Sequence, residues 1–162
     1  IGHYPDGISF GNVSKRVGTS EQFVISGTQT GAVARATVQH FTTVTSYDIE
    51  GNRVTCRGPL RASSESLTHA ALYRIDPQIG AVVHIHNATL WKKFYGELPT
   101  TDASVPYGTP GMAREIERLY RRCVYPNHYV ILMGGHQDGL ISFGQDVERA
   151  SEAMLSFLPD PN

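Results

Sequence analysis

The chain has 162 residues, of which 40% are hydrophobic and 18% charged, and its formal net charge is −1 at pH 7 with the histidines neutral. These values predict one globular domain over residues 1–162, large enough to bury a core. They exclude the basic excess typical of proteins that bind nucleic acid or an anionic membrane surface, and no apolar run is long enough to span a bilayer.

Short, partly alternating apolar runs dominate the first half of the chain. They predict strands over residues 11–17, 22–26, 38–48 and 53–57. The last two runs flank Glu50-Gly51-Asn52, which is suited to a hairpin turn.

The second half alternates between helical and strand patterns. Apolar spacing predicts a helix from Ser64 to Arg74, with a serine at its start that can cap it, and Pro77 ends it because the residue before proline is pushed out of the helical region. Strands are then expected over residues 80–86, 129–133 and 140–143, and helices over residues 88–95, 111–123 and 146–158. This order indicates one α/β domain with a mixed sheet covered on both faces.

Charged residues and cysteines carry little functional signal. The arginines of the helix expected over residues 111–123 alternate with glutamates, which is typical of a solvated helix face. Cys56 and Cys123 lie far apart with no motif around either, which favours two free thiols in a reducing cytosol and hence a cytoplasmic protein.

Two histidines close the apolar run AVVHIH at residues 81–86. Residues two apart on a strand project from the same face, roughly 6.6–7 Å apart, so His84 and His86 point the same way while Ile85 points into the core. Two imidazoles placed in this way can converge on one cation at Zn–N distances of about 2.0–2.1 Å. An H-x-H pair is, however, commoner in proteins without a metal at that position.

The segment Ser63-Ser64-Glu65 opens the helix that precedes this strand. Free backbone N–H groups and serine hydroxyls at a helix start form an anion-binding corner. The carboxylate of Glu65 has a purely structural explanation too, because the helix dipole favours it there. His69, four residues on, is expected to be structural, either hydrogen-bonding Glu65 or packing beneath it.

A glycine-rich segment, MGGHQDGLISFG at residues 133–144, follows another apolar strand. His136 could complete a three-histidine site with an open fourth position, which is the arrangement of a catalytic metal. Asp138 could do so instead, or could simply initiate a turn with Gly139.

Together these segments resemble the class II aldolase/adducin family. The resemblance spans nearly the whole chain in the family's order: GNVS at 11–14, ISG at 25–27, SSE at 63–65 with His69 following, AVVHIH at 81–86, PYGTPG at 106–111 and the glycine-flanked His136 segment. It implies a three-layer α/β/α sandwich around a mixed, largely antiparallel sheet. It also implies a homotetramer with the active site at the subunit boundary. The family's usual helix before the GN motif is missing here.

The resemblance also implies a set of site residues. The metal, Zn²⁺ or another divalent ion such as Mn²⁺ or Co²⁺, would be held by His84, His86 and His136, with Glu65 as the acid/base kept ionised by the cation. A substrate phosphate would be held by Asn12, Ser26, Gly27, Ser63 and Ser64, and Lys15 and Arg16 could add charge there.

The implied activity is a metal-dependent carbon–carbon lyase that acts on a small hydroxyketone, such as a ketose or sugar phosphate, through a metal-stabilised enediolate. Epimerases, a dehydratase, decarboxylases and the non-catalytic adducin head share the fold and remain alternatives.

Two departures from the aldolase pattern bear on these expectations. Aldolases usually have Gly directly after the third ligand, which would place Asp138 at that position, yet we expect His136 because a histidine at a strand end suits zinc better. Neither Tyr95 nor Tyr107 matches the tyrosine that protonates the leaving aldehyde.

Overall fold

The structure, a computed structural model, describes residues 1–124 and 129–158, without the side chains of residues 123 and 124. Its centre is a seven-stranded sheet of order β6-β5-β4-β3-β7-β9-β8. The strands are β3 (Asn12–Arg16), β4 (Phe23–Ser26), β5 (Phe41–Asp48), β6 (Arg53–Arg57), β7 (Ala81–His86), β8 (Val130–Leu132) and β9 (Gly139–Gly144). Each pairing between these strands is antiparallel, whereas an isolated bridge between Thr100 and Leu132 is parallel. The sheet is therefore largely antiparallel, as the family resemblance implied.

The helices are α1 (Ser66–Ile75), α2 (Ala88–Phe94), α3 (Pro110–Leu119) and α4 (Val147–Leu155). Three of them begin at side chains that accept a backbone N–H bond, namely Asn87, Thr109 and Asp146. The chain continues from α3 into a π-helical turn, η2 (Tyr120–Val124). None of the described helices is long and apolar enough to cross a membrane.

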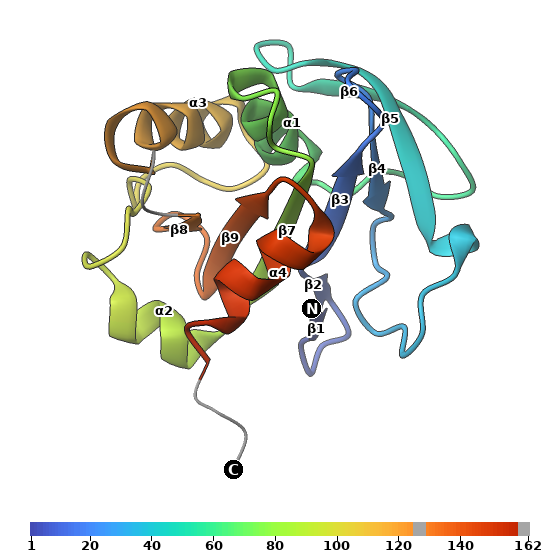
Figure 1. The fold of residues 1–162 in the computed structure, drawn as a ribbon. Helices are drawn as coiled ribbons and strands as arrows, with labels where there is room; N and C mark the ends of the chain where they lie inside the picture. The colour runs from blue at the N-terminus through green and yellow to red at the C-terminus, as the bar shows by residue number, and fades with distance from the viewer. Residues whose placement is uncertain (125–128, 159–162) are drawn as a thin grey trace.

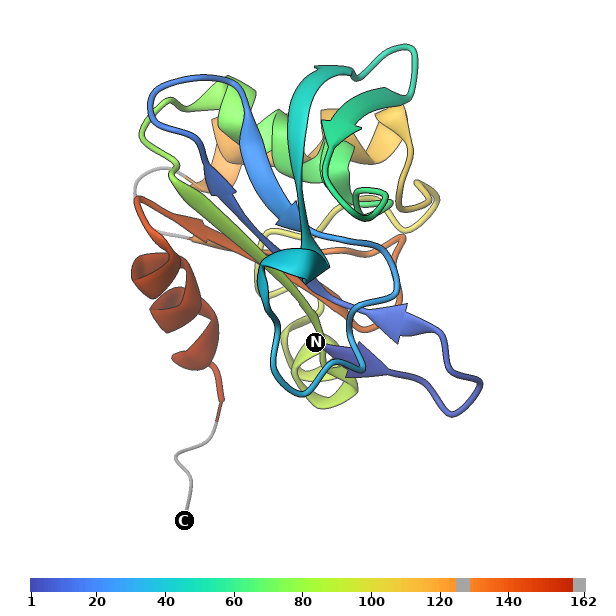
Figure 2. The same ribbon diagram turned by 90° about the vertical axis from the view of Figure 1, so that its right-hand side faces the viewer.

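The helices cover both faces of the sheet, which gives the three layers (Figures 1 and 2). Val82 of β7 packs in the main core with Leu72 of α1 and Ile116 of α3. Its neighbours Ala81 and Val83 pack on the opposite face, in a smaller cluster with a residue of α4. Strand alternation then places His84 and His86 on the α1 face, with Val82.

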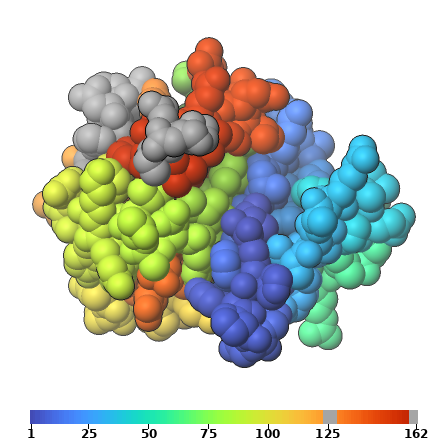
Figure 3. Space-filling view, turned by 90° about the horizontal axis from the view of Figure 1, so that it is seen from below, coloured from blue at the N-terminus to red at the C-terminus, as the bar shows by residue number. Residues whose placement is uncertain are grey.

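A small N-terminal hairpin precedes the sheet and was not predicted. β1 (Gly2–His3) pairs antiparallel with β2 (Ser9–Phe10). Seen from below, the dark-blue N-terminal residues project from the surface between the yellow-green segment around α2 and a light-blue loop (Figure 3). This hairpin brings residues 1–10 to the same end of the sheet as the end of β7, because Asn12 of β3 pairs with His84.

The start of α1 differs from the sequence prediction. The helix begins at Ser66, two residues later than predicted, and Ser64 does not cap it, because Glu65 is the N-cap residue and makes no side-chain cap bond. Ser63 instead closes a turn, since its carbonyl accepts bonds from the backbone N–H and the hydroxyl of Ser66. Glu65 therefore precedes the helix, and its side chain makes no capping bond to a backbone N–H of the first turn.

Other differences are local. Residues Val38–His40 form a 3₁₀ turn, η1, rather than the first part of a strand, so β5 begins at Phe41. The hairpin turn was predicted correctly, and Asn52 adopts a left-handed conformation there (φ 51°). Cys56 is a free thiol, while the side chain of Cys123 lies outside the described part of the chain.

Candidate functional site

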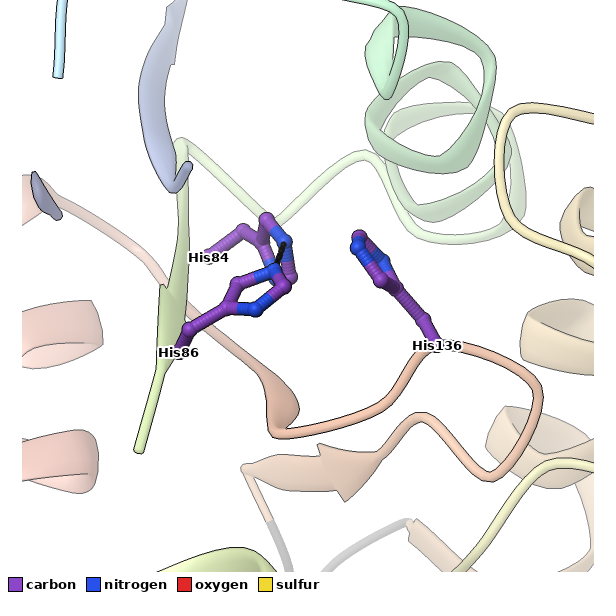
Figure 4. A group of neighbouring side chains, drawn as sticks. All are labelled: His84, His86 and His136. Carbon is purple, nitrogen blue, oxygen red and sulfur yellow. Dashed lines mark hydrogen bonds between the residues drawn. The ribbon is translucent and has the colours of Figure 1, made fainter. Parts of the chain in front are cut away.

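Three histidines converge at the end of β7. Their ligand atoms all lie within 4.8 Å of one another, although His136 comes from the turn before β9 rather than from the same strand. The imidazoles of His84 and His86 point toward the ring of His136, which faces them across a gap (Figure 4). His84 is fully buried, and the other two are half-buried.

The geometry of these rings suits a shared cation. The Nε2 atoms of His84 and His86 lie 3.2 Å apart, and His84 donates its Nδ1 proton to the carbonyl of Leu140 (3.0 Å). A neutral His84 therefore presents an Nε2 lone pair. Ligands at about 2.0–2.1 Å from a tetrahedral zinc ion lie roughly 3.3–3.4 Å from one another, close to the Nε2 separation seen here. The three residues fit a divalent metal with an open fourth position.

Electrostatics keeps the three imidazoles in the form that binds metals. Burial, with repulsion from the other two rings, lowers the pKa of His84 well below its usual value. Burial likewise lowers the pKa of His86 to about 4 and that of His136 to about 3. The rings are therefore neutral at pH 7, and a neutral imidazole has a lone pair to give to a cation.

A buried carboxylate lies beside the cluster. Glu65 is 2% exposed, and its Oε2 accepts a hydrogen bond from the hydroxyl of Thr68 (2.9 Å). Its Oε1 lies 3.6 Å from Nδ1 of His136, too far for a hydrogen bond, and neither atom has a partner within the described chain. Desolvation raises the pKa of Glu65 to about 7. Two unsatisfied buried atoms that face each other mark a place where a bound group is needed.

His136, and not Asp138, belongs to the cluster. Asp138 sits at the tip of the turn in a left-handed conformation (φ 65°), and its carbonyl accepts a bond from the backbone N–H of Asn87. The carboxylate of Asp138 is outside the three-ligand group. Its backbone role matches the alternative in which it initiates the turn with Gly139.

The residues expected to hold a phosphate lie partly around the same cavity. Asn12, Gly27, Ser63 and Ser64 line it, and Asn12 donates its amide to the Ser63 hydroxyl (3.0 Å). Ser26 is not among the lining residues; its hydroxyl accepts a bond from the backbone N–H of Val13 (3.1 Å). Ser26 therefore supports β3 instead of facing the cavity.

Lys15 and Arg16 do not add charge to the cavity. Arg16 is 9% exposed and donates to the carbonyls of Ile79, Tyr73 and Asp76, which lie at the other end of β3. It ties the end of α1 to the sheet. Lys15 is exposed on the same strand and is not a lining residue. The alternative that such residues are simply solvated fits Lys15, whereas Arg16 is buried and bonded to backbone carbonyls.

The side chain of His69 is hydrogen-bonded to Ser14 rather than to Glu65. Its Nδ1 is bonded to the Ser14 hydroxyl (2.7 Å), which also contacts the Tyr73 hydroxyl (2.7 Å). The predicted structural role fits this arrangement. Of the two predicted alternatives, the hydrogen bond to Glu65 is not formed, because Thr68 bonds the Glu65 carboxylate instead.

The sequence analysis did not assign a functional role to three aromatic residues of the site. The Tyr4 hydroxyl contacts Nδ1 of His86 (2.7 Å), and Phe10 packs against the same imidazole with ring centroids 5.0 Å apart. Tyr107 stacks on His136 with ring centroids 4.0 Å apart. Tyr107 lies in the PYGTPG motif, which was a usable signal, whereas Tyr4 and Phe10 belong to the unforeseen hairpin.

The cluster opens into a cavity of about 370 Å³. Its walls come from the N-terminal hairpin, the loop after β4, the segment before α1, the end of β7 and the turn before β9. No lysine or arginine is among the described lining residues. A small polar molecule that contacts the histidines can therefore reach the neutral donors near Asn12 and Ser63 at the same time.

Solved structures share this fold. L-fuculose 1-phosphate aldolase matches with 18% identity over 90% of this chain and 69% of that chain, at a TM-score of 0.67. A sugar-phosphate aldolase from Thermotoga maritima matches with 16% identity over 94% of this chain and 84% of that chain, at a TM-score of 0.66. YgbL from Escherichia coli, a candidate aldolase/epimerase/decarboxylase, matches with 20% identity over 93% of this chain and 77% of that chain, at a TM-score of 0.63.

Identities at this level establish a common fold and leave the reaction open. The family match is independent of them: residues 6–157 match the class II aldolase and adducin N-terminal domain. This match runs from the N-terminal hairpin to beyond α4 and contains all three histidines and Glu65. The chain therefore belongs to the class II aldolase and adducin family.

Proposed function

We propose that this protein is a metal-dependent lyase of the class II aldolase type that cleaves a carbon–carbon bond in a small hydroxyketone, most simply a ketose phosphate. The observation that carries the proposal is the convergence of His84, His86 and His136 beside the buried carboxylate of Glu65, at the end of a cavity. A non-catalytic module has no need for a desolvated carboxylate beside three imidazoles, because such a cluster is costly to bury.

The chemistry divides between the cluster and Glu65. A divalent ion held by the three histidines would supply Lewis acidity. In cleavage, Glu65 would take the proton of the substrate hydroxyl that becomes the aldehyde oxygen, and after the carbon–carbon bond breaks it would return this proton to the carbon freed by the cleavage. Desolvation raises its pKa to about 7 without metal, and a nearby cation would lower this pKa and keep the carboxylate ionised as a base.

Neutral donors that line the cavity fit an anion of modest size. Asn12, Ser63 and Ser64 line it beside the start of α1, where the helix dipole favours a negative group. The two hydroxyls and the amide would orient a phosphate without a full positive charge. Tyr107 also lines the cavity, so a phenol of the same chain is available to hydrogen-bond the substrate oxygen that becomes the aldehyde.

Epimerisation, dehydration and decarboxylation are alternatives that the same metal site would support with different surrounding residues, and YgbL is itself a candidate for aldolase, epimerase or decarboxylase activity. The proposed assembly is a homotetramer with the cavity at a subunit boundary. Light scattering of the purified chain tests this assembly directly.

The first test is the metal content of the untagged protein, measured by plasma mass spectrometry after addition and removal of excess Zn²⁺, Mn²⁺ or Co²⁺. We expect close to one ion per chain. Absence of any retained ion would refute the lyase and leave an adducin-head-like assembly module as the better explanation.

The second test separates the reactions. The metal-loaded protein is incubated with a panel of ketose phosphates and with the same sugars lacking phosphate, and the products are followed by proton NMR. Cleavage yields an aldehyde and a shorter ketone, epimerisation yields a diastereomer, and decarboxylation of added sugar acids yields carbon dioxide. We expect cleavage, with phosphorylated substrates preferred.

A further inference from the structure

The contact between Tyr4 and His86 is not used by the proposed function. The Tyr4 hydroxyl lies 2.7 Å from Nδ1 of His86, on the side of the imidazole opposite His84. Tyr4 belongs to the loop of the N-terminal hairpin, held by bonds from its own N–H to the carbonyl of Ile8 and from Gly7 to its carbonyl. Its ring packs on Phe10, which packs in turn on His86. The Tyr4 hydroxyl is therefore positioned by the backbone bonds of Tyr4 and by the packing of its ring on Phe10.

His84 and His86 are supported differently on their Nδ1 sides. Nδ1 of His84 faces the carbonyl of Leu140, which can only accept, so this ring is fixed with its proton on Nδ1. Nδ1 of His86 faces a hydroxyl, which can either donate or accept. His86 can thus place its single proton on either nitrogen without losing its partner.

The 3.2 Å contact between the two Nε2 atoms shows why this freedom is needed. His84 has a lone pair on Nε2, so the contact is a hydrogen bond only if His86 carries its proton on Nε2 and accepts from Tyr4 at Nδ1. A cation bound to both Nε2 atoms requires the other arrangement, with the proton of His86 on Nδ1 and donated to the Tyr4 oxygen.

We infer that Tyr4 is a positioning residue for His86: its hydroxyl supports the proton of this imidazole on either nitrogen, so that the Nε2 lone pair becomes available to a divalent cation. The inference rests on the proposed metal site, and it makes the N-terminal hairpin part of that site. Removing the partner of the second nitrogen of a metal-binding histidine typically costs about 10–100-fold in metal affinity.

The variant Tyr4→Phe tests the inference, because it keeps the ring on Phe10 and removes only the hydroxyl. Binding of Zn²⁺ and Co²⁺ is measured by competition with a chelator, and unfolding of the metal-free proteins reports on stability. Tyr95→Phe is the matched control, since this half-exposed ring packs on Trp91 and does not line the cavity. We expect Tyr4→Phe to weaken binding of both metals about 10-fold or more, with Tyr95→Phe unchanged.

Nitrogen-15 NMR of histidine in the wild-type protein gives a second readout that needs no variant. We expect the proton of His86 to move from Nε2 to Nδ1 when Zn²⁺ is added. A proton that stays on Nε2 with zinc bound would overturn the inference, even if Tyr4→Phe failed to fold.

The outcomes separate the two proposals. Zinc binding by the wild type with equal affinity in Tyr4→Phe would remove the positioning role and leave the metal site intact. Absence of zinc binding by the wild type would overturn both proposals.

Discussion

A single buried histidine, His69, and a cluster of three histidines lie on the α1 side of the sheet, and they differ in what their ring nitrogens face. His69 is fully buried, and its Nδ1 is bonded to a hydroxyl shared with Tyr73. His84, His86 and His136 turn their nitrogens toward one another beside a cavity. Burial lowers the pKa of all four rings, so a lowered pKa does not mark the metal site.

What distinguishes the site is the direction of the ring nitrogens. Nε2 of His69 also has no hydrogen-bond partner in the described chain, yet His69 is outside the three-ligand cluster. A single ring nitrogen surrounded by packed atoms is a structural cost, whereas three imidazoles whose nitrogens face a shared space can bind a cation. The following experiments sharpen or break this distinction.

The largest effect is expected on metal binding. His84→Ala and His136→Ala should each abolish retained metal, because two nitrogen ligands alone do not hold a divalent ion tightly. Asp138→Ala is the matched control from the same turn as His136 and should retain about one ion per chain, measured by plasma mass spectrometry. If metal were lost in Asp138→Ala but kept in His136→Ala, the third ligand would be Asp138 and not His136.

Next in size is the effect of Glu65→Gln on turnover. The amide keeps the shape of the side chain but cannot take a proton, so the rate should fall by about 10²–10⁴-fold while metal stays bound. Steady-state kinetics with the best substrate of the panel and metal analysis of the same sample check both halves. Full activity in Glu65→Gln would show that another group is the base.

A third prediction concerns acid stability of the metal-free protein. Burial lowers the pKa of His69 to about 3, below the value of 6.5 for an exposed histidine. The neutral ring thus contributes stability that is present above pH 6.5 and is lost as the pH falls toward 3. Urea unfolding should show a loss of a few kcal/mol over this range, and the slope against pH should be shallower in His69→Asn. An unchanged slope would mean that His69 is not the titrating group.

The smallest expected effect is the contribution of Glu65 to the pH dependence of stability, which is opposite in sign to that of His69. The folded-state pKa of Glu65 is raised from 4.5 to about 7 by desolvation. The stability that its protonated form provides is therefore complete below about pH 4.5 and is lost as the pH rises through 7. At pH 8 the metal-free Glu65→Gln variant should gain about 3 kcal/mol over the wild type relative to their difference at pH 4. Equal pH profiles of unfolding would show that Glu65 is better solvated than its burial indicates.

Much of the fold was predictable because its signals are local. The strand containing His84 and His86 was placed correctly from its apolar run, and the helix expected over residues 111–123 forms as α3, which buries Met112, Ile116 and Leu119. Helix starts were less predictable. Ser64 was predicted to start and cap the helix, but Ser63 makes a backbone turn with Ser66, and α1 begins at Ser66.

The sequence by itself determined that His84 and His86 share one face of a strand, because side chains alternate along any extended backbone. It also determined the family through an ordered set of short motifs. Only the tertiary structure decided that His136 rather than Asp138 joins them, that Glu65 faces His136, and that Tyr4 supports His86. The reason is physical: alternation is a property of neighbouring residues, whereas these approaches depend on how segments far apart in the chain pack against one sheet.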